Sequence, residues 1–243
     1  MTTNNVYIGV AGGAEMVHFS AYASIMNMTR RDGDSVPTFI QGTKGYEVRQ
    51  NHFDRFIASD HDYMLLLDGD MVFQEDTLER LRSHERPYVS GLYCYRTLSP
   101  IRLMWFKPWD GSFPFKPWID PPERGRLHDI GASGWGCVLI HRDVVTATRG
   151  ILAGEYDVLE DDMDVWPGTD LVLRGMQRPI IGSDIRYPFY ARAAGYQLQG
   201  DPDVRPRHLL TYGLSPDDYE NQPPERLEAT RQLLADMVGA VTE

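Results

Sequence analysis

The sequence predicts a single α/β domain in which helices flank a central sheet. Short apolar strands alternate with helical segments of about a dozen residues, which is the pattern of right-handed βαβ crossovers. The 243 residues are 42% hydrophobic and 24% charged, and neither an internal repeat nor a low-complexity linker divides them. This composition is typical of a globular protein with a sizeable core, and it excludes a disordered chain.

The first third of the chain predicts a βαβαβ unit. Apolar strands are expected over 6–11, 36–41 and 63–67, and helical spacing of apolar residues separates them over 15–28 and 47–59. The third strand is apolar at every position, as in strands that a parallel sheet buries on both faces. We therefore expect this strand at the centre of the sheet.

The remainder of the chain is less regular. Residues 107–126 carry five prolines among aromatic residues and cannot form a helix or strand. This segment is either a buried aromatic plug or a loop over a substrate. A C-terminal amphipathic helix opens at Pro223 and Pro224. We further expect helices over 75–83, 143–148 and 185–194 and strands over 88–95 and 138–140.

Charge and composition exclude several classes of protein. Lys and Arg number 24 against 35 Asp and Glu, a formal net charge of −11. This balance argues against nucleic-acid binding through bulk charge and suits a carboxylate site for a divalent cation.

The longest apolar run, 64–67, is too short to span a membrane, and the first five residues lack the basic start of a signal peptide. Cys94 and Cys137 lack CxxC spacing, which predicts buried, reduced thiols in a cytoplasmic protein.

A carboxylate pair follows the third strand. Asp68 and Asp70, with Gly69 between them, come directly after the apolar run. Ligands of open α/β sheets bind beyond the carboxyl ends of the strands. Two close carboxylates repel each other unless a cation lies near them, and oxygen ligands favour Mg²⁺ or Mn²⁺, whose shell is completed by waters and substrate phosphates. The alternative is that the tripeptide only forms a turn.

Two further patterns supply candidate functional residues. Ser183 and Asp184 precede the helix expected over 185–194. Either can cap that helix, and a carboxylate held there is also well placed to act as a base. His208 comes late in the chain, where a neutral imidazole can return to the cation site, although a lone histidine is often structural.

Together these motifs resemble those of GT-A fold glycosyltransferases, and most closely the inverting, family-2-like enzymes of the short stand-alone bacterial or phage type. The similarity runs from residue 6 to about residue 208, and its elements occur in the family's order. They are Arg49-Gln50-Asn51, the Asp-x-Asp motif of 65–70, Ser90-Gly91-Leu92-Tyr93, the glycine-rich stretch of 131–142 and the stretch of 183–196 that ends in Arg192-Ala193-Ala194-Gly195-Tyr196.

The resemblance implies an architecture and a reaction. A GT-A domain has a Rossmann-like nucleotide-binding half and a mixed central sheet flanked by helices. Here the nucleotide-sugar-binding half would span 1–100, the acceptor-side half 101–212 and a C-terminal helix 213–243, all in one domain over 1–243. The donor substrate would be a nucleoside-diphosphate sugar, and the acceptor a protein, a glycan or a small molecule.

The resemblance also implies roles for individual residues. Asp70 would ligate Mn²⁺ or Mg²⁺ directly, Asp68 would contact the donor ribose or the waters of the metal, and His208 would complete the protein ligands. Asp184 would be the general base that deprotonates the acceptor hydroxyl. The nucleotide sugar would further be bound by Ala11, Gly12, Arg49, Gly69, Gly134, Trp135 and Gly136.

The chemistry of these residues suggests how some of them would contact the donor. Arg49 would approach the nucleotide or its diphosphate. Gly134 and Gly136 would let the backbone come close to the sugar, with Trp135 as a flat stacking wall.

The chain departs from the family at Ser183, where a glutamate is usual. The acidic residues Asp161, Asp162 and Asp164 are candidates to compensate, and the proline-rich 107–126 is a candidate for acceptor specificity.

Two other functions are compatible with the same residues. The run 65–72 is also similar to the nucleophile motif of haloacid-dehalogenase-type phosphatases, with Asp68 as the nucleophile. Against that reading, a complete βαβα unit precedes Asp68, and the late acidic motif of that family is incomplete around Asp184. The third alternative is a non-catalytic sugar-nucleotide-binding module, which would need the metal site but no base.

Overall fold

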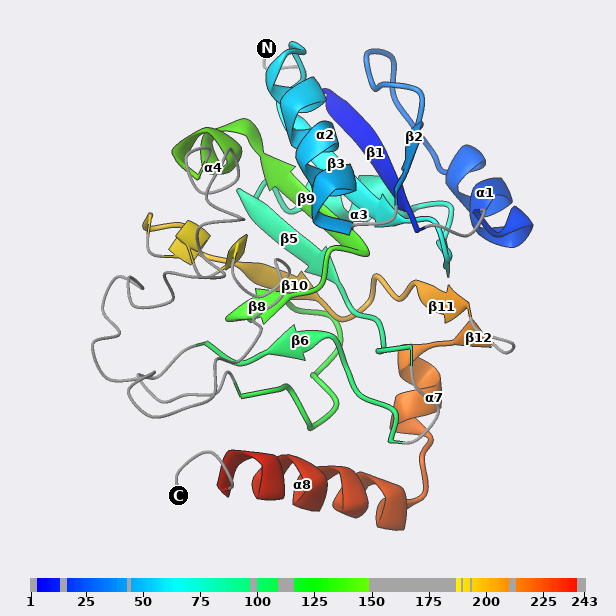
Figure 1. Cartoon of the computed structure of the whole chain (residues 1–243), viewed down its shortest axis with the longest axis vertical. Coiled ribbons are helices and arrows are strands. Elements are labelled where there is room, and N and C mark those ends of the chain that lie inside the picture. Colours follow the sequence, from blue (N-terminus) through cyan, green and yellow to red (C-terminus); the bar gives the residue numbers. More distant parts are fainter. Residues whose placement is uncertain are drawn as a thin grey trace.

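The computed structural model describes residues 4–13, 17–42, 45–96, 100–108, 116–148, 187–188, 190–192, 194–209 and 213–239. Within these ranges, seven strands form one mixed sheet flanked by helices, a Rossmann-like arrangement (Figure 1). In sheet order the strands are β2 (Thr38–Gln41), β1 (Val6–Gly12), β3 (Tyr63–Asp68), β9 (Cys137–His141), β5 (Tyr88–Gly91), β10 (Gln199–Asp201) and β7 (His128–Asp129).

The predicted βαβαβ unit is confirmed. β1 pairs in parallel with β2 on one side and with β3 on the other. Helices α1 (Phe19–Met26) and α2 (Gly45–Ile57) connect these three strands. β9 then runs antiparallel between β3 and β5, which makes the sheet mixed. The carboxyl ends of β1 and β3 therefore meet at one edge, where Ala11 lies opposite Asp68.

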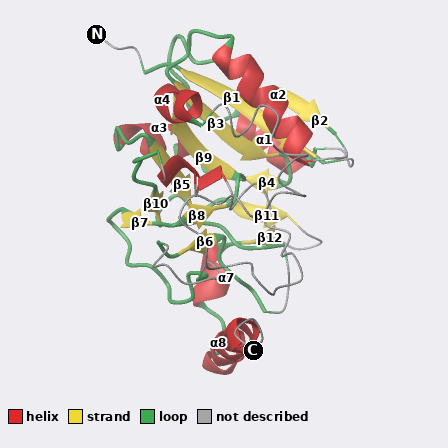
Figure 2. Cartoon of the chain, turned by 60° about the vertical axis from the view of Figure 1, so that its left-hand side comes forward, coloured by secondary structure: helices red, strands yellow, loops and turns green. Residues whose placement is uncertain are grey.

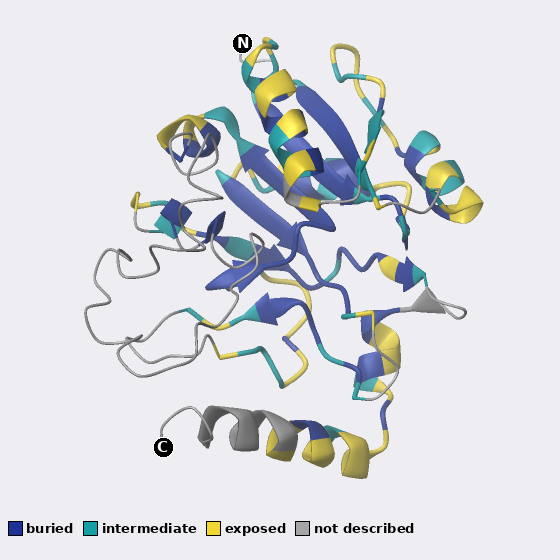
Figure 3. Ribbon diagram, viewed as in Figure 1, coloured by how far each residue is buried: buried dark blue, intermediate teal, exposed yellow. Residues whose placement is uncertain are grey.

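The sheet separates two hydrophobic clusters because successive side chains of a strand point to opposite faces. On one face, Met64 and Leu66 of β3 join the buried residues of α2 and of α4 (Arg142–Ala147). On the other, Leu65 and Leu67 join those of α1 and of α3 (Thr77–Ser83). β3 is thus buried on both faces, as its sequence predicts (Figure 3).

Several element boundaries differ from those expected. The first helix begins at Phe19, after extended His18, and β2 begins at Thr38, after a proline that has no N–H to pair. The strand expected over 88–95 ends at Gly91 because the next residue, Leu92, turns its backbone N–H to the Val204 carbonyl at 2.8 Å. Of the helix expected over 185–194, residues 187–188 and 190–192 are helical, and Gly195 follows with a φ of +91°.

Smaller elements complete the domain below the sheet (Figures 1 and 2). The expected C-terminal helix is α8 (Pro224–Gly239), which begins one residue later than Pro223. This helix lies apart from the central sheet in both views. The elements are β4 (Met71–Val72), β11 (Arg207–Leu209) and β12 (Gly213–Leu214) in one small sheet, β6 (Trp105–Phe106) and β8 (Ala132–Ser133) in a ribbon, and helices α7 (Pro216–Glu220) and α8 (Pro224–Gly239).

The described part of the proline-rich segment contains no helix and no extended strand, as expected. Pro117 forms an isolated bridge to Phe106. Trp118 packs edge-on against Trp105, with ring centroids 6.0 Å apart, and also against His128. Trp118 is thus partly buried against the core, while 109–115 lie outside the described residues. Whether the segment is an aromatic plug or a loop over a substrate stays a prediction.

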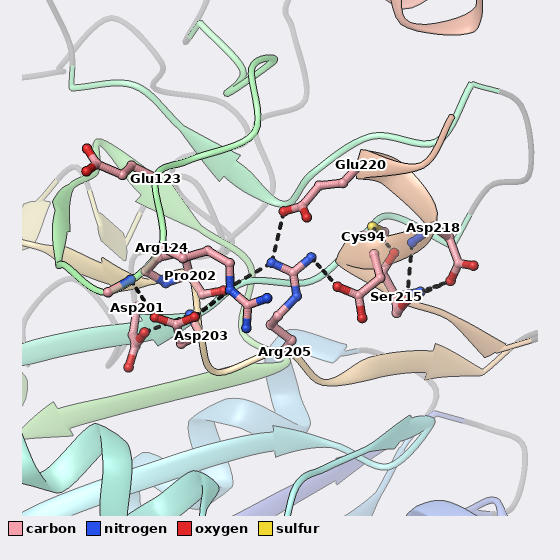
Figure 4. Close-up of polar contacts among 12 residues, drawn as sticks. Cys94, Glu123, Arg124, Asp201, Pro202, Asp203, Arg205, Ser215, Asp218 and Glu220 are labelled. Atoms are coloured by element: carbon pink, nitrogen blue, oxygen red, sulfur yellow. Dashed lines mark hydrogen bonds and ion pairs between the residues drawn. The ribbon is translucent and has the colours of Figure 1, made fainter. Parts of the chain in front are cut away.

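Buried Arg205 fixes the chain that leads to β11 (Figure 4). Its guanidinium donates to Glu220 Oε1 at 2.9 Å and to the Pro202 carbonyl at 3.2 Å, and it pairs with Asp217 Oδ1 at 2.8 Å. Both acids belong to α7, which begins with a capping box at Ser215. These contacts hold α7 and the start of β11 against each other.

A buried histidine under β1 predicts a pH-dependent stability. Nε2 of His52 lies 3.1 Å from the Val10 carbonyl, which can only accept, so Nε2 donates and Nδ1 is free to accept from the Tyr7 hydroxyl at 3.1 Å. This is a neutral imidazole. Burial is the main reason that the pKa of His52 falls from 6.5 to about 4, and Arg55 and Arg49 lower it further against the Val10 hydrogen bond.

The unfolded chain therefore binds this proton more readily than the folded chain. We expect the free energy of unfolding to fall as pH drops from 6.5 toward 4, with roughly 3 kcal/mol attributable to His52. Urea unfolding at several pH values measures it, with His52→Gln as the control, since an amide can keep both hydrogen bonds without titrating. Equal losses of stability in the two proteins across this window would contradict the assignment.

Candidate active site

A cavity of about 540 Å³ opens at the edge where β1 and β3 end. Most residues singled out in the sequence line it, and they come from the ends of β1 and β3, from α2, from the loop before β9 and from β11. Those that line it are Ala11, Gly12, Arg49, Asp68, Gly69, Asp70, Gly134, Trp135 and His208. Gly136 lies behind Asp68.

The turn that carries the two carboxylates is held by backbone hydrogen bonds to other segments of the chain. The N–H of Gly69 donates to the Ala11 carbonyl at 2.8 Å, and the N–H of Asp68 donates to the Gly136 carbonyl at 3.1 Å. The Asp70 carbonyl accepts from the N–H of Leu209 at 2.7 Å. The turn is therefore fixed in position, with its side chains directed to the cavity that Asp68 and Asp70 line.

Each carboxylate already has a cationic neighbour. Arg49 lies 3.3 Å from Asp68 Oδ1, and Arg96 lies 2.8 Å from Asp70 Oδ2. His208 Nε2 lies 3.4 Å from the other oxygen of Asp70. The compensation that two close anions require is thus supplied in this state by side chains of the chain itself.

The orientation of His208 follows from its other ring nitrogen. Nδ1 lies 2.8 Å from the Cys94 carbonyl, so Nδ1 donates and Nε2 is left facing Asp70. Burial opposes charging of this ring, but contact with Asp70 and the hydrogen bond to Cys94 raise the pKa of His208 above its ordinary value. Burial likewise opposes the charge of Asp70, but His208 and Arg96 outweigh it and lower the pKa of Asp70.

The glycines before β9 are required by packing inside the protein. A Cβ at Gly134 would lie 2.0 Å from the Tyr93 hydroxyl oxygen, and one at Gly136 would lie 2.7 Å from Met71 Sδ and 3.0 Å from Asp68 Oδ2. The Tyr93 hydroxyl also accepts from the Gly136 N–H at 2.9 Å. Gly136 thereby leaves Asp68 room to keep its place at the cavity.

Trp135 lies at the cavity wall with its ring largely covered. It is 3% exposed. Its ring packs edge-on against Phe53, with centroids 5.6 Å apart, and at a tilt against Tyr187, with centroids 4.8 Å apart. Its indole N–H is buried and has no hydrogen-bond partner among the described residues. Whether a sugar stacks here remains a prediction.

The described residues fit a divalent cation with few protein ligands. Within the described ranges, no group of three His, Cys, Asp or Glu side chains is arranged to hold a metal. Asp70 and His208 are adjacent, whereas Asp68 is turned toward Arg49. One carboxylate and one imidazole, completed by waters and substrate phosphates, is a coordination that Mg²⁺ or Mn²⁺ accepts. The proposed base Asp184, its neighbour Ser183 and the acidic Asp161, Asp162 and Asp164 lie outside the described residues.

Sequence reasoning missed Arg96. This residue lines the cavity and contacts Asp70, although it belongs to none of the motifs. It lies three residues after Tyr93, beyond the end of a strand next to the carboxyl-edge cavity. A basic residue in that position is the signal that would have suggested it.

Among solved structures, A197 from STIV is similar to this chain. The match has a TM-score of 0.56 at 15% sequence identity, and it covers 88% of this chain and 91% of that one. The two proteins share a fold. No family model and no curated protein matches the sequence. No helix in the part of the chain that the structure describes combines the length and the apolar character needed to cross a membrane.

Proposed function

We propose that this protein is an inverting glycosyltransferase that moves a sugar from a nucleoside-diphosphate sugar to an acceptor hydroxyl, with a divalent cation at Asp70. The observation that carries the proposal is the charge pattern of the cavity. Asp68 and Asp70 meet Arg49, Arg96 and His208 there. A chain with a net charge of −11 thus places two arginines and a histidine beside these carboxylates, which suits an anionic ligand held together with a metal ion.

The geometry supports a division of labour among these residues. Asp70 and His208 would bind the cation, which supplies positive charge to the leaving diphosphate as the glycosidic bond breaks. Hydrogen bonding to the Cys94 carbonyl orients His208 for this role. Arg49, which pairs with Asp68 and lines the cavity, would contact the nucleotide.

The base of the proposed reaction comes from the motif of 183–196. For direct inversion, Asp184 would accept the proton of the acceptor hydroxyl as its oxygen attacks the anomeric carbon, and the diphosphate leaves from the opposite face. One contact supports a role for this motif at the cavity: Tyr187, which belongs to the same stretch, packs on the cavity residue Trp135. With Ser183 in place of the usual glutamate, another group would help to position the acceptor.

Thermal unfolding with UDP-, GDP- and TDP-sugars, each with and without Mn²⁺, tests the proposal. We expect one nucleotide to raise the unfolding temperature when Mn²⁺ is present, with stabilisation of about 2.7 kcal/mol at a hundred times the dissociation constant. If none of the nucleotide sugars stabilises the protein with Mn²⁺, the proposal is wrong. Hydrolysis of a phosphomonoester that Asp68→Asn abolishes would instead favour the phosphatase.

A further inference from the structure

We propose that Arg96 pairs with Asp70 until a divalent cation displaces it, and that Arg96 then binds the diphosphate. This inference rests on the proposed function, and it assigns to the leaving group a residue outside the recognised motifs. It starts from the shortest charged contact in the cavity, the 2.8 Å ion pair between Arg96 and Asp70 Oδ2.

The two arginines that line the cavity among the described residues differ in how far their side chains are exposed. The side chain of Arg49 is 23% exposed and that of its partner Asp68 is 21% exposed, so this pair is largely enclosed. The side chain of Arg96 is 58% exposed. The backbone next to it is anchored, because Tyr95 donates its N–H to the Arg102 carbonyl at 2.7 Å. Arg96 can therefore turn its side chain without a movement of the preceding backbone.

Asp70 cannot bind Arg96 and a divalent cation equally well at the same time. Its Oδ2 is occupied by Arg96, and its Oδ1 faces His208 at 3.4 Å. A divalent ion bound to this carboxylate would lie beside the guanidinium, and the two positive charges would repel each other. Binding of the metal is therefore expected to weaken or release the contact with Arg96.

The released guanidinium has a suitable anion in the same cavity. Arg96 lines the cavity together with Asp70 and His208, so a diphosphate bound to the metal at Asp70 would lie next to it. A guanidinium binds phosphate oxygens through two parallel N–H groups, and it keeps its charge at any physiological pH. Arg96 would thus stabilise the negative charge that the diphosphate gains on leaving.

The exchange predicts effects of opposite sign for one substitution. Without nucleotide, Arg96 competes with the metal, so Arg96→Gln should bind Mn²⁺ more tightly, by about threefold to tenfold. With Mn²⁺ at saturation, the same variant lacks a phosphate contact and should bind the nucleoside diphosphate about tenfold more weakly. A residue with only a structural role would not shift the two affinities in opposite directions.

The test measures both affinities in the full-length protein. Electron paramagnetic resonance of free Mn²⁺ gives the metal affinity, and calorimetry with UDP, GDP and TDP at saturating Mn²⁺ gives the nucleotide affinity. Arg96→Lys keeps the positive charge but lacks the two parallel N–H groups of a guanidinium. Its metal and nucleotide affinities should lie between those of the wild type and of Arg96→Gln. Arg126→Gln is the matched control, because Arg126 is 63% exposed, pairs with Glu123 and does not line the cavity.

The outcomes separate this inference from the proposed function. If the wild type binds a nucleoside diphosphate with Mn²⁺ but Arg96→Gln changes neither affinity, or changes both in the same direction, the inference is overturned and the proposed function stands. If the wild type binds none of the three nucleotides with Mn²⁺, both are overturned. Tighter metal binding together with weaker nucleotide binding in Arg96→Gln supports the inference.

Discussion

Asp70→Asn is expected to lower the release of nucleoside diphosphate from the donor sugar by about a thousandfold. The amide keeps the size of the side chain but removes the charge that faces His208 and Arg96. It would bind a divalent cation poorly, and it would leave Arg96 without its counter-ion. The Mn²⁺-dependent rise in unfolding temperature should disappear in the same variant. Both are measured with the nucleotide sugar that stabilises the wild type.

Two matched substitutions make this result specific. Asp60→Asn is the same chemical change in the exposed turn before β3, at the far end of that strand from Asp70, and it should leave both readouts unchanged. Asp184→Asn should keep the Mn²⁺-dependent stabilisation and abolish transfer, because a base acts on the acceptor and not on the nucleotide. Transfer at the wild-type rate in Asp70→Asn would remove the metal from the proposed mechanism.

The position of the carboxylate pair could be predicted because it depends on local patterns. The short apolar run at 63–67 predicts a strand buried on both faces, and the alternation of strands and helices before it indicates parallel pairing with β1. Those two facts bring Asp68 and Asp70 to the carboxyl edge of the sheet. His208 could be placed there only from its late position in the chain and its order in the resemblance, since the two-residue ladder between β11 and β4 has no periodicity to detect.

The partners of these residues could not be predicted, because they depend on contacts distant in sequence. Arg96 meets Asp70 across 26 positions, and the Cys94 carbonyl that orients His208 lies 114 positions away. The glycines at 134 and 136 were expected to admit a sugar. In the structure they are required for another reason, because a Cβ at either position would clash with Tyr93 or Met71. That crowding depends on how β5 and β4 approach the loop before β9.

The largest expected loss of stability lies outside the cavity, at a buried ion pair below β1. Arg82 of α3 contacts Asp34 Oδ2 at 2.5 Å, and the two side chains are 2% and 0% exposed. Asp34 also accepts from the backbone N–H of Val6 at 3.0 Å and of Arg31 at 2.7 Å. Its carboxylate therefore joins α3, the loop before β2 and the first residue of β1.

Asp34→Ala is expected to lower the free energy of unfolding by about 3–5 kcal/mol, because it leaves the guanidinium of Arg82 buried without its main counter-ion and two backbone donors without an acceptor. Arg82→Met removes the charge and keeps apolar bulk. In the double variant the charge penalty is gone, so its loss should be smaller than the sum of the two single losses by about 1–3 kcal/mol. Urea unfolding of the four proteins measures this coupling. Strictly additive losses would mean that Asp34 acts on the backbone of β1 alone and that Arg82 is held by Glu79, 3.3 Å away, instead.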